Sequence, residues 1–254
     1  MKEEGEERAR GERGENGHEG RCILVGAGDF FGLPFPIEES DYLIAADAGY
    51  LHLKALSVKP DLLIGDFDSM ELPGGERGRE ERKGISIFSD SERAYYLSRI
   101  VRGEYEGVET GRIDPVKNDS DLLAACRIGL KKGFREFHLL GAGGKRIDHS
   151  IANLQLLAFL AEKGCRAYLH GETEIVTALR NGSRRFSSER RGYFSALSFT
   201  DFSLGVSERG FRYLIEDVRL TNLLPTGLSN EFIGEEAEIS VREGTLLLIY
   251  GPPY

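Results

Sequence analysis

Short apolar runs alternate with helical patterns along the first two thirds of the chain. The apolar runs have the length of buried strands and lie at 22–25, 42–46, 61–64, 137–140 and 166–170. Between them, apolar residues recur at helical spacing over 50–57, 119–132 and 150–163. Nearly continuous apolar strands that alternate with helices indicate a parallel sheet covered on both faces. We therefore predict an α/β fold class, with a Rossmann-like domain over residues 21–170.

The pattern changes after residue 170. Short alternating runs, separated by Gly, Asn, Ser and Pro, lie at 193–199, 210–214, 237–241 and 246–250. Alternation with a period of two and no long helical pattern is typical of a β-sandwich or barrel. We predict an all-β sandwich domain over residues 171–254.

Two segments fit neither pattern. Residues 1–20 are mostly Glu, Arg and Gly, and so few apolar side chains cannot offset the entropy that ordering would cost. We predict a disordered tail there. Residues 71–116 are charged and glycine-rich, although 95–101 are compatible with a helix. We interpret 71–116 as a long connection with some structure of its own.

Composition narrows the function classes. The 254 residues carry a net charge of −9, which argues against general binding to nucleic acid or to anionic membranes. This negative charge is still compatible with a small anionic substrate, because a metal ion can reverse the charge of a pocket. The three cysteines are far apart in the sequence, which favours buried thiols over disulfides or a zinc site. Without an apolar membrane span or signal peptide, we expect a cytoplasmic protein.

Acidic residues fall where predicted strands end or predicted helices begin. They are Asp47 after the second strand, Asp66 and Asp68 after the third, Asp119 and Asp121 at the start of a helix, and Asp148 before the next helix. In an open α/β sheet, ligands bind outside the carboxyl ends of the strands. We expect these carboxylates to converge at that edge.

Asp66 and Asp68 are the strongest candidates for a metal pair. In an extended segment, positions i and i+2 point to the same side, where two carboxylates repel each other unless a cation lies between them. Mg²⁺ suits, since it prefers one or two carboxylates together with water and phosphates. An isolated Asp-x-Asp is more often a turn or a cap. The other acids expected at the same sheet edge favour the metal site.

Two loops add positive charge. Lys117 and Ser120 lie at the start of a predicted helix, whose N-terminus favours phosphate, although ordinary capping by Ser120 or Asp119 is an alternative. The loop 141–149 combines glycines with Arg146, which can bind phosphate bidentately, but it lacks the Walker A spacing. The alternative there is a flexible loop. Gly26-Ala27-Gly28 is either a tight turn or a phosphate loop.

Taken together, five blocks in order resemble the thiamine pyrophosphokinase family. They are Ala46-Asp47-Ala48-Gly49, Gly65-Asp66-Phe67-Asp68-Ser69, Lys117-Asn118-Asp119-Ser120-Asp121, Gly144-Lys145-Arg146-Ile147-Asp148-His149 and Gly227-Leu228-Ser229-Asn230-Glu231. The resemblance implies transfer of the pyrophosphoryl group of ATP, the co-substrate, to thiamine, which yields thiamine diphosphate and AMP. It also implies Mg²⁺ as cofactor and a homodimer with active sites between subunits.

The resemblance further implies roles for single residues. Those near the metal and the phosphates are Asp66, Asp68 and Asp121 as Mg²⁺ ligands, Asp47 and Asp148 in the acidic site, and Arg146, Lys117 and Ser120 at the nucleotide. Ser229 and Asn230 would contact the thiamine pyrimidine. Either Asp148 or Asp121 would be the general base. Asn118 stands where the family often has an acid, with Asp119 as a candidate substitute, and its effect on metal binding stays open.

Two other functions remain as alternatives. One is a pyrophosphokinase for another acceptor, such as a hydroxymethyl pterin, which would share the metal and ATP residues. The block Ser229-Asn230-Glu231 favours thiamine over that acceptor. The other is a non-catalytic protein that binds nucleotide or thiamine, with Asn118 as a first sign of lost activity.

Overall fold

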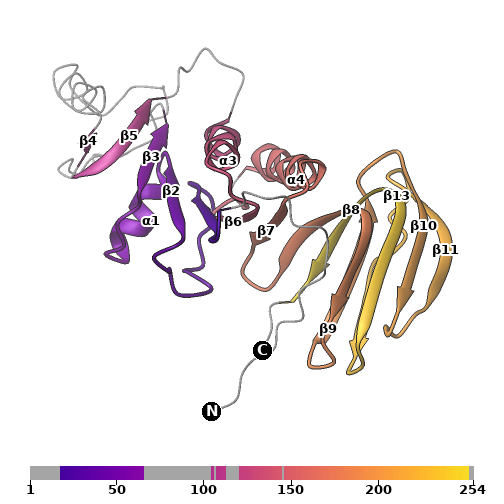
Figure 1. The fold of residues 1–254 in the computed structure, drawn as a ribbon. Helices are drawn as coiled ribbons and strands as arrows, with labels where there is room; N and C mark the ends of the chain where they lie inside the picture. Colours follow the sequence, from indigo (N-terminus) through magenta and orange to yellow (C-terminus); the bar gives the residue numbers. More distant parts are fainter. Residues whose placement is uncertain (1–17, 66–103, 106, 113–119, 145, 252–254) are drawn as a thin grey trace, which may run out of the picture.

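The computed structural model describes residues 18–65, 104–105, 107–112, 120–144 and 146–251. Within these ranges a continuous hydrogen-bonded sheet runs through the molecule, with its helices gathered at one half (Figure 1). Helices and strands alternate in the first half, and strands alone form the second half of the described chain. The structure is thus a mixed α/β fold with a large sheet and few helices.

Parallel strands build the first half of the sheet. They are β1 (Cys22–Val25), β2 (Tyr42–Ala46), β3 (Leu62–Gly65), β5 (Val108–Arg112), β6 (Glu136–Leu140) and β7 (Arg166–His170). Their order is β7-β6-β1-β2-β3-β5, and the short β4 (Glu104–Tyr105) pairs antiparallel with β5 at the edge. The predicted parallel sheet is confirmed, because all pairs from β7 to β5 are parallel.

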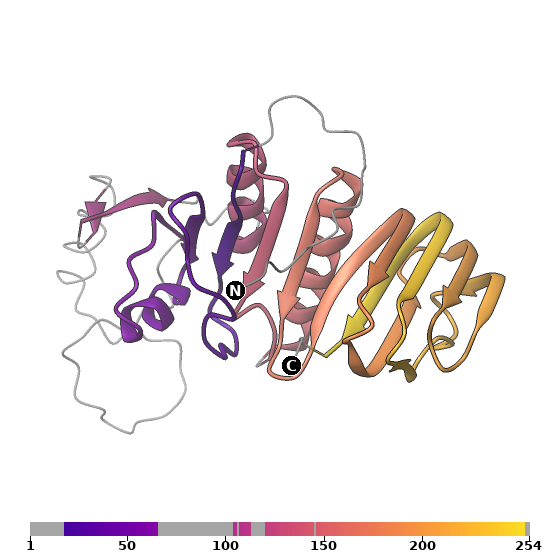
Figure 2. The ribbon, with the colours of Figure 1, turned by 60° about the horizontal axis from the view of Figure 1, so that its bottom comes forward.

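Three described helices pack against this half. Helices α3 (Asp121–Lys131) and α4 (Ile147–Glu162) cover one face (Figure 2). Cys22 and Leu24 of β1 belong to the core on that face. Helix α1 (Gly49–Ala55) packs against the other face, where Ile23 and Val25 point. Because successive side chains of β1 point to opposite faces, this strand contributes buried residues to the hydrophobic cores on both faces of the sheet.

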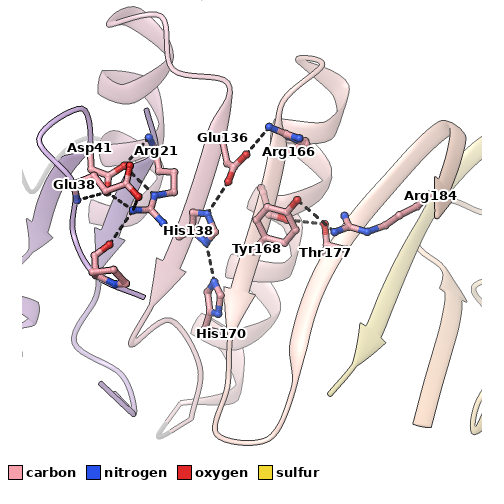
Figure 3. A network of polar contacts seen from close by, with 12 residues as sticks. Arg21, Glu38, Asp41, Glu136, His138, Arg166, Tyr168, His170, Thr177 and Arg184 are labelled. Atoms are coloured by element: carbon pink, nitrogen blue, oxygen red, sulfur yellow. Dashed lines mark hydrogen bonds and ion pairs between the residues drawn. The ribbon is translucent and has the colours of Figure 1, made fainter. Parts of the chain in front are cut away.

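The face of β6 and β7 on the α1 side is polar. His138 donates to or accepts from His170 at 2.9 Å and contacts Glu136 at 3.1 Å, and Arg166 pairs with Glu136 at 2.6 Å (Figure 3). Phe35 packs edge-on against His138. The expectation of a sheet covered by helices on both faces therefore holds for β1 and β2 but not for this part.

Antiparallel strands build the second half. They are β8 (Ile175–Phe186), β9 (Arg191–Ser198), β10 (Phe202–Arg209), β11 (Ile215–Thr221), β12 (Asn230–Ile233) and β13 (Ala237–Tyr250). The long β13 pairs with β8, β9 and β10 around an aromatic core that includes Phe186, Phe194 and Phe211. Strand β8 also pairs with β7, so the sheet is continuous between the two halves.

Several predicted boundaries differ from the structure. The runs 237–241 and 246–250 are one strand, β13, with an irregularity between Val241 and Thr245. The predicted strand 210–214 is wrong, because these residues connect β10 to β11. Helix α4 begins at Ile147 instead of 150. His18, inside the predicted tail, packs with its ring tilted against that of Phe134, so the packed chain begins before Arg21.

Other predictions concern cysteines, membranes and residues without a described position. Cys22, Cys126 and Cys165 are buried free thiols, as predicted. None of the described helices is long and apolar enough to cross a membrane. The predicted tail up to residue 17 and most of the 71–116 connection, including the possible helix 95–101, lie outside the described residues.

Candidate active site

The carboxyl ends of β6, β1, β2 and β3 lie at one edge of the sheet. The chain proceeds from β1 to β2 and β3 in one direction, whereas β6 and β7 lie on the opposite side of β1. The strand order therefore reverses between β1 and β6, and such switch points are where open α/β sheets bind ligands. This edge is the candidate active site.

Two glycine loops meet at the switch point. The Gly28 N–H donates to the Gly141 carbonyl at 2.7 Å, and the Asp29 N–H donates to the Gly143 carbonyl at 2.9 Å. A Cβ on Gly28 would lie 2.3 Å from the Gly143 oxygen, so only glycine permits this approach. Contact between the two loops explains the glycine at position 28, and both alternatives for Gly26-Ala27-Gly28, a tight turn and a phosphate loop, stay predictions.

Asp47 lies at the end of β2 and is 7% exposed. Its backbone is left-handed, with φ of 52°, and its N–H donates to the Ile64 carbonyl of β3 at 2.7 Å. A Cβ on Gly65 would be 3.2 Å from Asp47 Oδ1, so the end of β3 lies directly against this carboxylate. Gly65 is the last described residue before Asp66 and Asp68, which lie outside the described residues, as does Lys117.

Helix α3 begins beside the same edge. Ser120 is its N-cap and accepts a hydrogen bond from the Leu123 N–H at 3.3 Å, which settles the capping alternative in favour of Ser120 over Asp119. A Cβ on Gly26 would lie 3.2 Å from Leu122 Cδ1, so the first turn of α3 packs against the end of β1. Asp121 is the acidic residue of that first turn.

Arg146 and Asp148 open helix α4. The Arg146 guanidinium donates from Nε to Asp148 Oδ1 at 3.1 Å and from Nη2 to Oδ2 at 2.5 Å. This pairing holds the pKa of Asp148 below its usual value and raises that of Arg146. Both side chains are exposed, at 68% and 61%, and are accessible to a ligand.

Asn153 holds the loop that carries Arg146. Its Nδ2 donates to the Ala142 carbonyl at 2.6 Å, and the side chain is buried. Sequence reasoning missed this residue. The available signal was an amide, one of two together with Gln155, inside the mostly apolar helix pattern of 150–163.

Ser229 and Asn230 belong to the other half of the molecule. Ser229 is exposed, with φ of 60°, and its N–H donates to Ser195 Oγ at 3.1 Å. Asn230 is buried, and its amide already makes four hydrogen bonds, to Glu208, Glu231 and twice to Tyr213. The strands around β11 and the strands around β2 lie at opposite ends of the sheet (Figure 1).

The residues at the edge fit a hard divalent cation. Asp47, Asp121 and Asp148 offer carboxylate oxygens, which Mg²⁺ prefers over nitrogen or sulfur. Within the described ranges, no three acidic, His or Cys side chains are grouped closely enough to form a complete metal site. Two of the three predicted ligands, Asp66 and Asp68, belong to the undescribed segment.

Comparison with known proteins decides the family. The model of the thiamin pyrophosphokinase catalytic domain matches residues 36–169, more than half of the chain. The chain belongs to the thiamin pyrophosphokinase family. The family predicted from the five sequence blocks is therefore confirmed. Thiamin pyrophosphokinases are transferases, and the matched range contains each predicted acidic residue from Asp47 to Asp148.

Relatives and solved structures agree with this family. Thiamine pyrophosphokinase of Bacillus subtilis (strain 168) is 24% identical over 213 residues, which cover 84% of this chain and 88% of the relative. The crystal structure of the Bacillus subtilis thiamine pyrophosphokinase has a TM-score of 0.70 at 20% identity, and covers 93% of this chain and 100% of that one. A thiamin pyrophosphokinase family protein from Enterococcus faecalis has a TM-score of 0.68 at 25% identity, with 92% and 100% covered.

Proposed function

We propose that this chain transfers the pyrophosphoryl group of ATP to the hydroxyl of thiamine and forms thiamine diphosphate and AMP. One observation within the family fold carries the proposal. The buried Asp47 carboxylate lies against the end of β3, at the edge where the strand order reverses. Carboxylate oxygens are the ligands that Mg²⁺ prefers, so the place of Asp47 at a ligand-binding edge favours a metal-dependent site.

Mg²⁺ would be held by Asp66, Asp68 and Asp121, with Asp47 beside them. When bound, it would neutralise charge on the phosphates and on the leaving oxygen of AMP. The exposed Arg146 guanidinium, with Lys117 and Ser120 at the start of α3, would bind phosphate oxygens of ATP. Phosphoryl chemistry depends chiefly on such positioning and charge neutralisation.

Asp148 and Asp121 are the candidates for the general base. The base would accept the proton of the thiamine hydroxyl as its oxygen bonds to the β-phosphorus and AMP leaves with the electrons of the broken bond. Asp148 is ionised at neutral pH, since Arg146 lowers its pKa. Because Asp121 is also a proposed Mg²⁺ ligand, Asp148→Asn and Asp121→Asn are compared at saturating Mg²⁺, and the variant whose turnover excess Mg²⁺ does not restore identifies the base.

We propose that residues 21–170 form the catalytic unit and 171–254 a sandwich that binds the thiamine pyrimidine through Ser229 and Asn230. Within one chain these groups lie in different halves of the sheet. This separation supports a homodimer in which the second half of one subunit lies at the acidic edge of its partner, with active sites between the subunits. The buried free thiols support a cytoplasmic location.

A product assay tests this function. The purified chain is incubated with ATP, Mg²⁺ and thiamine, and the products are separated and identified. We expect AMP and thiamine diphosphate in equal amounts, and neither without Mg²⁺. Formation of ADP, or conversion of a hydroxymethyl pterin but not of thiamine, would reject the proposed function.

A further inference from the structure

Glu208 of β10 is a carboxyl group buried in the second half, at 3% exposure. Its Oε2 accepts a hydrogen bond from Asn230 Nδ2 at 2.5 Å, and its buried Oε1 has no hydrogen-bond partner among the described residues. Burial raises the pKa of Glu208. A buried carboxylate with one hydrogen bond is strongly disfavoured, so the neutral acid is the form that this site stabilises.

The two residues paired with Glu208 on the flanking strands carry no charge. The residues opposite it are Ile215 on β11 and Ile239 on β13, both apolar. The nearby charges are engaged elsewhere, in ion pairs of Arg209 with Glu216 and of Arg212 with Glu231. The surroundings of Glu208 therefore supply the Asn230 amide and no described counter-charge.

The orientation of the Asn230 amide is fixed by the backbone around it. Its Oδ1 accepts from the Tyr213 and Glu231 N–H groups, both at 2.9 Å. Its Nδ2 donates to the Tyr213 carbonyl at 2.7 Å and to Glu208. A flipped amide would direct its NH₂ group at two N–H donors, so Nδ2 must face Glu208.

These contacts connect two surface loops. Asn230 holds Tyr213, in the loop between β10 and β11, and follows directly on Ser229. The side chains of Tyr213, Leu214 and Leu228 are exposed around this connection. An exposed apolar surface beside an exposed hydroxyl suits a flat, partly apolar ring with polar edges.

We infer that Glu208 is a positioning residue of the thiamine subsite. As a neutral carboxylic acid, it fixes the Asn230 amide and, through it, the relative placement of Tyr213 and Ser229. The inference rests on the proposed function, since it assumes that Ser229 and Asn230 face thiamine. Glu208 itself is too deeply buried to touch the substrate.

The test compares Glu208→Gln with Glu208→Ala. Glutamine keeps a neutral group with an oxygen for Asn230 Nδ2, so we expect its KM for thiamine to stay within about twofold of wild type. Alanine leaves the Asn230 N–H without its partner, and we expect the KM for thiamine to rise about tenfold or more. The KM for ATP should stay unchanged in both variants. Glu216→Ala, an exposed acid of the same half, is the matched control and should resemble wild type.

An infrared difference spectrum between wild type and Glu208→Gln tests the neutral acid directly. We expect the carbonyl stretch of a protonated carboxyl group to disappear in the variant, and this readout needs no turnover. A carboxylate band in its place would overturn the inference, even if Glu208→Ala fails to fold.

The kinetic outcomes separate the inference from the function on which it rests. Wild-type protein that makes thiamine diphosphate, with an unchanged KM for thiamine in Glu208→Ala, would overturn the inference alone. Equal impairment of Glu208→Gln and Glu208→Ala, or a parallel rise of the KM for ATP, would also overturn it. Wild-type protein that neither binds nor converts thiamine would overturn both.

Discussion

Arg146 binds both carboxylate oxygens of Asp148 at the first turn of α4. The pair is exposed to solvent and lies on the loop that Asn153 attaches to the helix. Exposed ion pairs contribute little to folding stability. Because the pair is already oriented and contributes little to folding stability, Arg146 and Asp148 can each bind a substrate group in place of the other at small cost in stability.

Asp148→Asn separates a functional from a structural role of this pair. We predict a fall in turnover of about 100-fold or more, as for loss of a general base, with an unchanged melting temperature. Asp217→Asn is a matched control, because Asp217 forms a comparably exposed ion pair with Arg242 at 2.8 Å. Normal turnover in Asp148→Asn would remove Asp148 from the reaction.

Asp47→Asn tests the metal at the sheet edge. A ligand that binds only the folded state raises the melting temperature, so we expect Mg²⁺ to stabilise the wild-type protein. The variant should lose most of this shift and most of its turnover, while the exposed Asp201→Asn keeps both. An unchanged response to Mg²⁺ in Asp47→Asn would contradict the place of this carboxylate beside the metal.

His170 makes stability depend on pH. Burial, followed by the charge of His138, lowers the pKa of His170 to about 3. An unfolded histidine has a pKa of about 6.5, so the unfolded state takes up a proton that the folded state excludes. The stability that neutral His170 contributes is therefore fully present above pH 6.5, and it is lost progressively as the pH decreases from there towards 3.

His170→Gln should reduce this slope by at most one proton, or about 1.4 kcal/mol per pH unit. Urea unfolding between about pH 5 and 6.5 isolates the effect, because carboxyl groups titrate mainly below this window. The exposed His149→Gln should retain the wild-type slope. A slope that His170→Gln leaves unchanged would mean that His170 is protonated in the folded protein.

Gly129 sets the distance between α3 and the sheet. A Cβ at this position would lie 2.6 Å from both Cys22 Sγ and Phe137 Cε1. Alanine in a helix gains about 1 kcal/mol over glycine, but overpacking a core costs about 1–3 kcal/mol. We predict that Gly129→Ala lowers the free energy of unfolding, whereas Gly182→Ala in β8, where a Cβ would make only ordinary van der Waals contacts, changes it little. Urea titrations measure both, and a more stable Gly129→Ala would disprove the close packing.

Much of the parallel half could be predicted from the sequence, because each of its strands is a continuous apolar run that is recognisable without its partners. The second half followed less well. Strand β8 contains Arg180-Asn181-Gly182-Ser183-Arg184-Arg185, which has no strand pattern of its own and is held by pairing with β13. The run 210–214 alternates like a strand, yet a Cβ on Gly210 would lie 2.0 Å from the Glu236 carbonyl, and its φ of 72° turns the chain.

The candidate site was likewise predictable only in part. Parallel strands share one carboxyl edge. The predicted strand ends were therefore enough to expect Asp47 and the starts of α3 and α4 at that edge. The pairing of Arg146 with Asp148 was not predictable, since it depends on side-chain geometry around the helix start. Glu208 gave no signal, because only the fold buries it beside Asn230.

Transfer of label from ATP tests the central claim most directly. Thiamine and Mg²⁺ are supplied with ATP labelled at either the α- or the γ-phosphorus, and the labelled products are identified. We predict that the γ label appears in thiamine diphosphate and the α label in AMP, and that Asp66→Asn abolishes both. A γ label in thiamine monophosphate, with the α label in ADP, would contradict pyrophosphoryl transfer by this chain.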